Sequence, residues 1–130
     1  MSKESAQAWL ESALADLKSI EYIKNDDFLT HMVAFHAQQC VEKCFKAFLE
    51  YAGQRVPKEH STLKLYGLVK NEFPVEVQLD LLTDLDDLYI DARYPGDLGL
   101  LPHGKPTKDE SREFFELAQY VFDIVRKHTQ

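Results

Sequence analysis

Residues 34–53 carry the most informative pattern of hydrophobic and polar positions in the chain. At the helical advance of about 100° per residue, their apolar side chains cover roughly half of the circumference rather than a narrow stripe. A helix with so wide an apolar surface needs neighbours on two sides, so the pattern predicts a central helix. Its apolar positions are Ala34, Ala37, Cys40, Val41, Cys44, Phe45, Phe48, Leu49, Tyr51 and Ala52.

The polar positions of this predicted helix fall into two groups. One group lies opposite the apolar surface, and we expect it to be solvated: Gln39, Glu42, Lys43, Lys46 and Glu50. Within it, Glu42 and Lys46 stand in the order that favours an ion pair along a helix. Gln38 instead points into the apolar surface, where an amide needs hydrogen-bond partners. Gln38 is therefore either a structural hydrogen-bonder or part of a polar site between helices.

One helix is predicted before the central helix and is joined to it by a short turn. Residues 5–24 carry apolar side chains at helical spacing. Asp16 falls at the border of their apolar face, where it is either a boundary carboxylate in water or a partner for a charged residue of another helix. Residues 25–30 supply the turn, and the central helix is expected to end at Gly53, since glycine suits the left-handed end of a helix.

Three helices are predicted after the central helix. Ser61 is expected to cap a short one. Pro74 is tolerated in the first turn of a helix but not inside one, so it is expected to open a longer helix over residues 75–92. The side chains expected on its core face are Leu79, Leu82, Leu85, Tyr89 and Ile90. Thr107 and Glu110 form a capping box at the start of a last helix, whose apolar residues repeat at intervals of three and four. The residues of this repeat are Phe114, Phe115, Ala118, Val121, Phe122 and Val125.

These elements and the composition define the expected fold class. The 130 residues suit one domain with its own core, and the sequence shows neither strand-like alternation nor an internal repeat. We predict an all-α fold over residues 1–130, an up-and-down antiparallel helical bundle of four long helices and one short helix. The sequence contains no run of about 18 apolar residues and no apolar leader, so we expect no membrane contact and a cytoplasmic protein. Cys40 and Cys44 are four residues apart on one helix, too far for a disulfide, and are expected to be reduced thiols.

Charge is unevenly distributed along the chain. The net charge of −7 argues against indiscriminate binding of nucleic acid. Residues 43–70 contain six basic and two acidic residues, whereas residues 71–99 contain one basic and eight acidic residues. This asymmetry can orient a partner.

Two charged residues, Asp86 and Arg93, fall on the core side of the helix predicted over residues 75–92. Burying an unpaired charge is costly, so each is expected to be paired or functional. Two helical turns, about 10 Å, separate them, so each can meet a residue such as Gln38 or Asp16 from another helix. Arg93 offers a planar donor fork that suits phosphate, and Tyr94 offers a ring on which a base can stack. We therefore predict a binding site for an anionic ligand made of Arg93, Asp86, Tyr94, Gln38 and Asp16.

Metal sites and classical catalytic motifs are not expected. The acidic residues on one side of the helix predicted over residues 75–92 are expected to be solvated: Asp80, Asp84, Asp87 and Asp91. His36, Cys40 and Cys44 share a helix face but lack a fourth ligand and the usual spacing of a zinc site. There is no serine nucleophile elbow and no phosphate-binding glycine loop. We expect neither a metal nor a cofactor.

The segment before the last helix favours association. Residues 92–106 hold three prolines and three glycines and exceed the usual length of a helix connection. Leu98, Leu100 and Leu101 lie in this segment, and the second and last helices have broad apolar surfaces. We predict a symmetric homodimer.

Three parts of the sequence resemble the HEPN domain family of small bacterial and archaeal helical proteins. They are FHAQQCVEKCFKAFLEYAG at residues 35–53, the connection at residues 57–60 and LYIDARYP at residues 88–95. The resemblance covers nearly the whole chain. It implies a helical bundle, homodimerisation and a partnership with a minimal nucleotidyltransferase, often as a toxin–antitoxin pair.

The resemblance also raises the question of whether the chain carries a ribonuclease motif. Many members of the wider family are metal-independent ribonucleases, with an arginine and a histidine a few residues apart at the end of the fourth helix. Arg93 matches the arginine. The nearest histidine, His103, follows only after nine intervening residues, so the expected nuclease motif is missing.

Three functions follow as hypotheses. The first is a binding module that engages a nucleotide, or a minimal nucleotidyltransferase, through the predicted ligand site. The second is a ribonuclease in which Arg93 holds the scissile phosphate and His103 or His60 acts as acid and base. The third is an interaction scaffold without a ligand site. The charges on the core side of the helix and the missing histidine favour the first, and the acidic net charge argues against the second.

Overall fold

The computed structural model describes the backbone of residues 2–93 and 105–130 and the side chains of residues 3–89 and 105–130. These parts of the chain are helical and contain no strand. The elements in chain order are α1 (Ser2–Ile23), the 3-10 turn η1 (Asp27–Leu29), α2 (Thr30–Tyr51), α3 (Thr62–Val69), α4 (Leu79–Arg93) and α5 (Lys108–His128). The predicted all-α fold class is confirmed.

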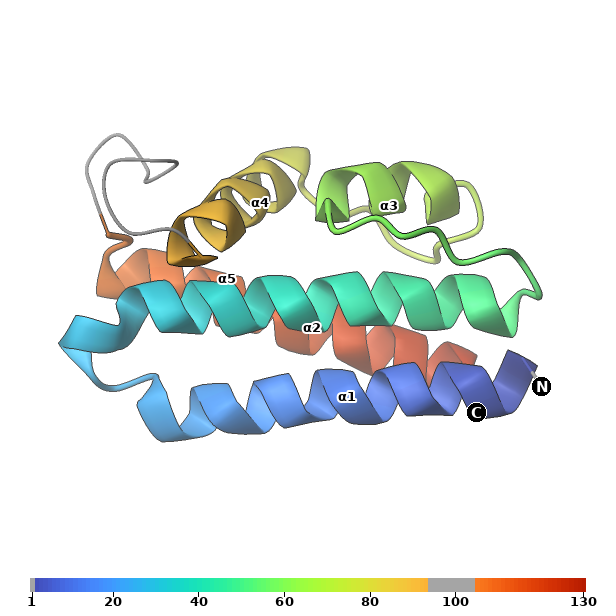
Figure 1. Ribbon diagram of the computed structural model, residues 1–130, viewed down its shortest axis with the longest axis horizontal. Helices are drawn as coiled ribbons and strands as arrows, with labels where there is room; N and C mark the ends of the chain where they lie inside the picture. The colour runs from blue at the N-terminus through green and yellow to red at the C-terminus, as the bar shows by residue number, and fades with distance from the viewer. Residues whose placement is uncertain (1, 94–104) are drawn as a thin grey trace.

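Helix α2 is the centre of the bundle. It packs against each of α1, α3, α4 and α5. Helices α1, α2 and α5 extend along the length of the molecule, whereas α3 and α4 follow one another along one side of α2 (Figure 1). The two ends of the chain meet at one end of the bundle, where Gln7 Nε2 donates to the carbonyl oxygen of Thr129 at 3.5 Å. The prediction of a central helix with neighbours on several sides is confirmed.

The core forms around the wide apolar surface of α2. Phe45 is fully buried and contacts the rings of Tyr66 and Phe73, with ring centroids 5.7 Å and 5.5 Å away. From α5, the core receives most of the predicted repeat, together with one residue outside it: Phe114, Leu117, Ala118, Val121, Phe122 and Val125. Phe115 of the same repeat is only half-buried. No described helix combines the length and the apolarity that crossing a bilayer requires.

The predicted helix ends are confirmed at three positions. Gly53 follows α2 with φ of 74°, a left-handed conformation that glycine adopts without strain. Ser61 caps α3, since its Oγ accepts from the backbone N–H of Lys64 at 3.1 Å. Thr107 and Glu110 form the reciprocal capping box at the start of α5, with hydrogen bonds of 2.8 Å and 3.1 Å.

The predicted start of the helix over residues 75–92 was wrong. Helix α4 begins at Leu79 rather than at residue 75. The segment after Pro74 is held outside the helix because Val77 is buried and its backbone N–H donates to the hydroxyl oxygen of Tyr66 at 3.1 Å. Leu79, which we expected in the core, is consequently 55% exposed.

Candidate functional site

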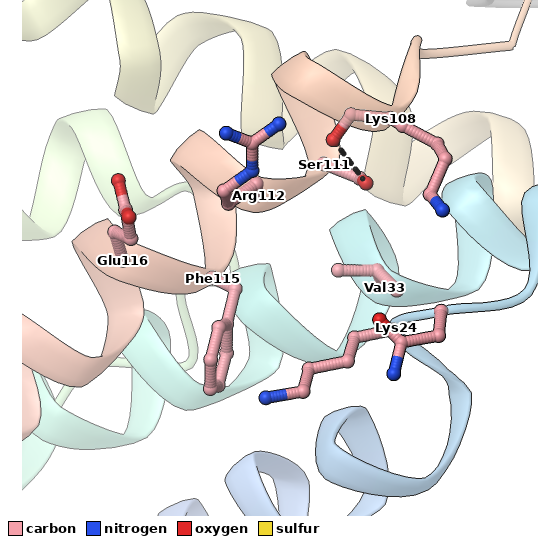
Figure 2. Close-up of a pocket in the computed structure, with 8 residues that line it drawn as sticks. Lys24, Val33, Lys108, Ser111, Arg112, Phe115 and Glu116 are labelled. Carbon is pink, nitrogen blue, oxygen red and sulfur yellow. Dashed lines mark hydrogen bonds between the residues drawn. The ribbon is translucent and has the colours of Figure 1, made fainter.

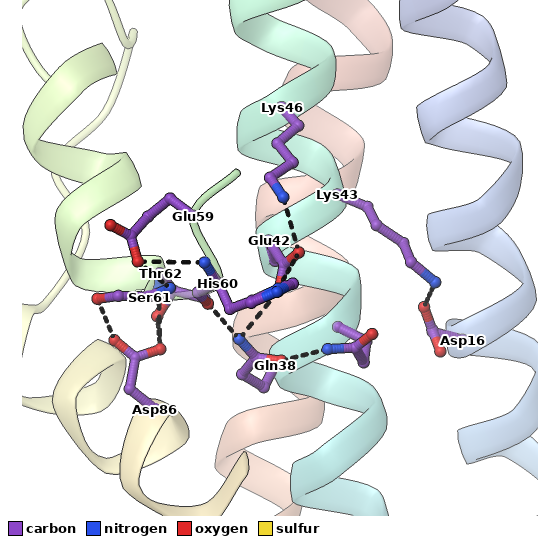
Figure 3. A network of polar contacts seen from close by, with 11 residues as sticks. Asp16, Gln38, Glu42, Lys43, Lys46, Glu59, His60, Ser61, Thr62 and Asp86 are labelled. Carbon is purple, nitrogen blue, oxygen red and sulfur yellow. Dashed lines mark hydrogen bonds and ion pairs between the residues drawn. The ribbon is translucent and has the colours of Figure 1, made fainter. Parts of the chain in front are cut away.

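A column of polar residues is buried along one face of α2. Gln38, Glu42 and Lys46 follow one another at intervals of one helical turn and are only 0%, 5% and 5% exposed. Gln38 Nε2 donates to Glu42 Oε1 at 3.4 Å, and Lys46 Nζ donates to Glu42 Oε2 at 3.0 Å (Figure 3). The amide oxygen of Gln38 accepts from Gln39 Nε2 at 2.7 Å. The buried amide and both buried charges are therefore satisfied, as burial demands.

The expectation of a solvated stripe was wrong for Glu42 and Lys46. Trp9 of α1 covers one side, with Lys46 Nζ lying 5.4 Å from the centre of its ring. His60, in the connection between α2 and α3, covers the other side. The remaining members of the expected stripe are half-buried: Gln39, Lys43 and Glu50. Because α2 has neighbours on so many sides, even its polar face loses contact with water.

His60 connects this buried column to the surface. Its Nδ1 lies 3.2 Å from Glu42 Oε2, and its carbonyl oxygen accepts from Gln38 Nε2 at 2.7 Å. A carboxylate only accepts hydrogen bonds, so Nδ1 donates, which fixes the orientation of the ring. The His60 side chain is nevertheless 61% exposed. A buried carboxylate thus holds an exposed imidazole in place.

Aromatic rings continue this surface from His60 toward the end of α4. The ring centroid of Tyr89 lies 6.0 Å from that of His60. Tyr89 also stacks on Phe35 of α2, with centroids 5.7 Å apart and ring planes 13° from parallel. Four residues advance a helix by about 6 Å, so the backbone of Arg93 lies one turn beyond Tyr89. We call His60, Tyr89, Phe35 and the end of α4 the His60 face.

Asp86 has a clear structural role within the same region. Its carboxylate accepts from the Thr62 N–H and the Thr62 hydroxyl, both at 2.8 Å, from the Ser61 hydroxyl at 2.9 Å and from the Leu63 N–H at 3.1 Å. The Thr62 and Leu63 N–H groups are among the backbone donors that the first turn of a helix leaves without intrahelical partners. The negative charge also suits the positive end of the helix dipole. Asp86 therefore ties α4 to the start of α3, and its contact with a ligand stays a prediction.

The other predicted site residues are described to different degrees. Arg93 is the last residue of α4, but its side chain lies outside the described part of the structure. Tyr94 and His103 lie entirely outside it. Leu98, Leu100 and Leu101 of the predicted interface segment also do so. Their predicted roles in ligand binding, catalysis and dimerisation stay predictions.

Asp16 belongs to a separate polar group between α1 and α2. It is 7% exposed and accepts from His36 Nδ1 at 2.9 Å and from Lys43 Nζ at 2.7 Å. These contacts confirm a charged partner on another helix and rule out the simple reading of a carboxylate in water. Figure 3 shows Asp16 on the α1 side of α2, and Asp86 on the other. The five predicted residues therefore do not all converge, and Gln38 is the one that joins His60 directly.

A hollow between the end of α1 and the first half of α5 has a volume of 380 Å³ (Figure 2). Three cationic residues line it, but each already faces a carboxylate. Lys24 pairs with Glu21 at 3.0 Å and Lys108 with Asp27 at 3.1 Å, and Arg112 pairs with Asp109. Because this balance leaves little net positive charge, we assign the hollow no ligand.

The two cysteines are buried free thiols, as their spacing predicts. Cys40 Sγ lies 3.8 Å from the carbonyl oxygen of Ala118. Burial, together with the neighbouring Cys40, raises the pKa of Cys44 well above its usual value. A thiol that resists ionisation is neither a good nucleophile nor a good metal ligand. The described residues include no group of three or more His, Cys, Asp or Glu side chains placed to hold a metal ion.

Fold and site together define a helical domain in which a central helix carries a column of buried polar residues that ends at an exposed histidine. The model of the HEPN domain family matches residues 6–128. The chain therefore belongs to the HEPN domain family, which confirms the resemblance inferred from its sequence.

Two solved structures share this architecture over almost their whole length. The protein TT1696 from Thermus thermophilus is 25% identical, with a TM-score of 0.73 over 95% of this chain and 97% of that chain. ST0689, an archaeal HEPN homologue, is 22% identical, with a TM-score of 0.65 over 97% of this chain and 98% of that chain. The comparison with curated proteins gave no match.

The site residues that sequence reasoning missed are Glu42 and Lys46, with His60 named only as an alternative catalytic group. A signal for the first two was present. Gln38 was correctly placed in the apolar surface, and Glu42 lies one turn from it on the same face. No comparable signal exists for the Glu42–His60 contact, because it depends on how the connection between α2 and α3 folds back.

Proposed function

We propose that this HEPN domain is a binding module for a nucleotide, and that it works with a minimal nucleotidyltransferase in a pair of the toxin–antitoxin type. One observation carries the proposal of a ligand: the buried Glu42 holds the exposed His60 ring at 3.2 Å. Burying a carboxylate and a lysine is unfavourable unless they are well paired, and exposed positions for charge are plentiful on a helix. The buried Glu42–Lys46 ion pair orients the exposed imidazole of His60, and this arrangement is best explained by a ligand that binds the imidazole.

The His60 face suits the phosphate of a nucleotide. With Nδ1 committed to Glu42, the second ring nitrogen of His60 makes no hydrogen bond to any described residue. That nitrogen donates to a phosphate oxygen when the ring is protonated. Arg93, one turn beyond Tyr89 in α4, is the matching donor fork in this proposal. Tyr94 retains its proposed role as a stacking ring.

The aromatic residues of the same face suit the base. Phe35 and Tyr89 are half-buried and stack on each other, so their orientations are fixed before a ligand arrives. Fixed rings add contact area to a bound base with little loss of side-chain freedom. The proposed ligand thus has a phosphate at His60 and Arg93 and a base toward the rings.

The decisive experiment is thermal unfolding with a small panel of ribonucleotides. A nucleotide at 100 times its dissociation constant stabilises the native state by about 2.7 kcal/mol. For a chain of this length that is roughly 10 °C in the unfolding temperature. We expect a saturable shift with the parent protein and none with Arg93→Gln or His60→Ala. Lys58→Ala, an exposed change in the same connection, is the matched control and should keep the full shift.

Two results would decide against nucleotide binding. If no nucleotide shifts the parent, but a minimal nucleotidyltransferase does and His60→Ala prevents it, the His60 face docks the partner protein instead. If neither shifts the parent, the chain is a scaffold without a ligand site.

The Glu42–His60 pair also favours one second candidate, a metal-independent ribonuclease. A carboxylate that orients an imidazole is the arrangement used in general acid–base catalysis. Losing such a group lowers the rate by about 10² to 10⁴. We expect little cleavage of RNA in single-turnover assays, because the family spacing after Arg93 is missing. Cleavage that disappears in both Arg93→Ala and either His60→Ala or His103→Ala would reverse this ranking.

The module is proposed to act as a symmetric homodimer. The proposal rests on the resemblance to the family and on the apolar segment at residues 98–101, because the apolar surfaces of α2 and α5 lie in the core of the chain itself. Light scattering at micromolar concentration should give twice the mass of the chain. A monomeric mass would contradict the proposal.

A further inference from the structure

A groove that shares no lining residue with the His60 face lies between the start of α4, together with the segment that precedes it, and the middle of α5. Its volume is 420 Å³. The apolar part of its lining comes from both elements: Val77, Leu81, Leu117 and Tyr120. One of these side chains, Tyr120, is large and 48% exposed.

The charged residues that line this groove are all acidic. They are Glu76 from the segment before α4, and Glu113 and Glu116 from α5. Beyond them, the acidic faces of α4 and α5 approach each other. Partial burial and the carboxylates of Asp87, Asp80, Glu110 and Glu113 raise the pKa of Asp84 above its usual value. Negative charge is therefore concentrated along the seam between the two helices.

From the apolar floor and the acidic rim we propose that this groove docks an amphipathic helix of a partner protein, with leucine-like residues on one face and lysine or arginine residues along its edges. A helix fits because the groove runs beside α5, and its α5 residues Glu113, Glu116, Leu117 and Tyr120 recur at the i, i+3 and i+4 spacing of one helix face. Positive edges fit because every charged residue that lines the groove is a carboxylate. The site lies apart from the His60 face and does not depend on nucleotide binding.

Charge complementarity favours a basic partner for this groove over a nucleic acid. Nucleic acid is disfavoured, since its phosphates would face the carboxylates of the rim. A second copy of the chain offers exposed basic residues between α2 and α4, namely Arg55, Lys58, Lys64 and Lys70, and it remains an outcome of the test. A basic amphipathic helix meets both the floor and the rim, which gives specificity as well as affinity.

The test uses a fluorescent peptide of about 18 residues, long enough for five helical turns, with leucine at i, i+4, i+7 and i+11 and lysine or alanine elsewhere. Fluorescence anisotropy at about 0.15 M salt, where exposed charges are well screened, should show saturable binding to one site per chain. Glu113→Lys and Tyr120→Ala should each weaken binding at least about tenfold, because one adds a repelled charge and the other removes an apolar anchor. Both side chains lie on the surface, so both variants should fold.

Matched controls distinguish docking from general attraction to an acidic protein. Glu11→Lys changes the net charge as Glu113→Lys does, but it lies on α1 outside the groove, and it should change the affinity less than about twofold. A peptide of the same composition with its leucines out of helical register should bind far more weakly. Equal losses in Glu11→Lys and Glu113→Lys, or equal binding of the two peptides, would overturn the proposal.

Two further measurements on Glu113→Lys, of its self-association and of its thermal shift with nucleotide, complete the test. If Glu113→Lys turns a self-associating parent into a monomer, the occupant is a second copy and the proposal is wrong. The nucleotide shift described for the His60 face should be unchanged in Glu113→Lys. That result keeps a failure of the groove separate from a failure of the nucleotide site.

Discussion

Replacing Lys46 by methionine tests whether the polar column of α2 is buried. Methionine keeps a long flexible side chain against Trp9 but removes the ammonium group that pairs with Glu42 at 3.0 Å. The carboxylate, whose side chain is 7% exposed, then keeps only Gln38 and His60 as partners. Removing one partner of a buried ion pair costs about 3 to 5 kcal/mol. We expect the lower end, because these two hydrogen bonds remain.

The size of the stability loss distinguishes a buried Glu42–Lys46 pair from a solvated one. The entropy of unfolding is about 0.27 kcal/mol per kelvin for a chain of this length, so a loss of 3 kcal/mol lowers the unfolding temperature by about 11 °C. If Glu42 and Lys46 formed the solvated pair that their spacing suggests, the loss would be about 0.3 to 0.5 kcal/mol, or roughly 1 to 2 °C.

Circular dichroism during thermal and urea unfolding measures this difference. Glu42→Gln combined with Lys46→Met removes both charges, so the double variant should be more stable than the sum of the single losses predicts. Lys18→Met, an exposed change on α1, is the matched control and should have little effect. High salt should not mask the loss, since buried pairs are poorly screened. A loss below about 2 °C in Lys46→Met would refute the burial of this column.

Three further predictions concern the stability of the helical bundle. Asp86→Ala should destabilise the protein by about 2 to 3 kcal/mol, because it leaves the N–H of the buried Thr62 without an acceptor. Hydrogen exchange should speed up first at Thr62, and unchanged exchange would contradict the capping role. Asp84→Asn should stabilise the protein at pH 7, by less than about 1 kcal/mol: a raised pKa means that the native state favours the protonated form, so stability falls as pH rises. The gain should vanish near about pH 3, where the carboxyl is protonated in both states; a gain that persists there would have another cause. Phe45→Asp should abolish the cooperative unfolding transition, since it buries a carboxylate without a partner, and a transition within a few degrees of the parent would show that the core is misplaced.

The fold could be predicted well because its signals are local. Helical spacing, Gly53, Ser61 and the Thr107 capping box each act within a few residues, so they define the helices and most of their ends. The start of α4 could not be predicted, because Pro74 permits a helix there. A long-range hydrogen bond from Val77 to Tyr66 prevents it.

The candidate site was predictable only in part, for a related reason. A single helix tells which residues share its face, and this correctly placed Gln38 in the interior. Whether the polar side of the helix is solvated depends on the segments that pack against it. Here Trp9 and His60 cover Glu42 and Lys46. Asp86 was rightly expected to have partners. Its partners are the donors of a helix end, which only the folded chain brings to it.

The most direct test of the central claim follows the rings of the five histidines by NMR while the nucleotide with the largest thermal shift is added. We predict that the ring signals of His60 move and saturate at the dissociation constant found by thermal unfolding. The signals of His128, which stacks on Phe48 at the end of α5, should stay in place. In Glu42→Gln, which loosens the hold on the His60 ring, the same titration should saturate at a higher concentration. If the nucleotide stabilises the protein while the His60 signals do not move, the ligand binds elsewhere and the account of this site is contradicted.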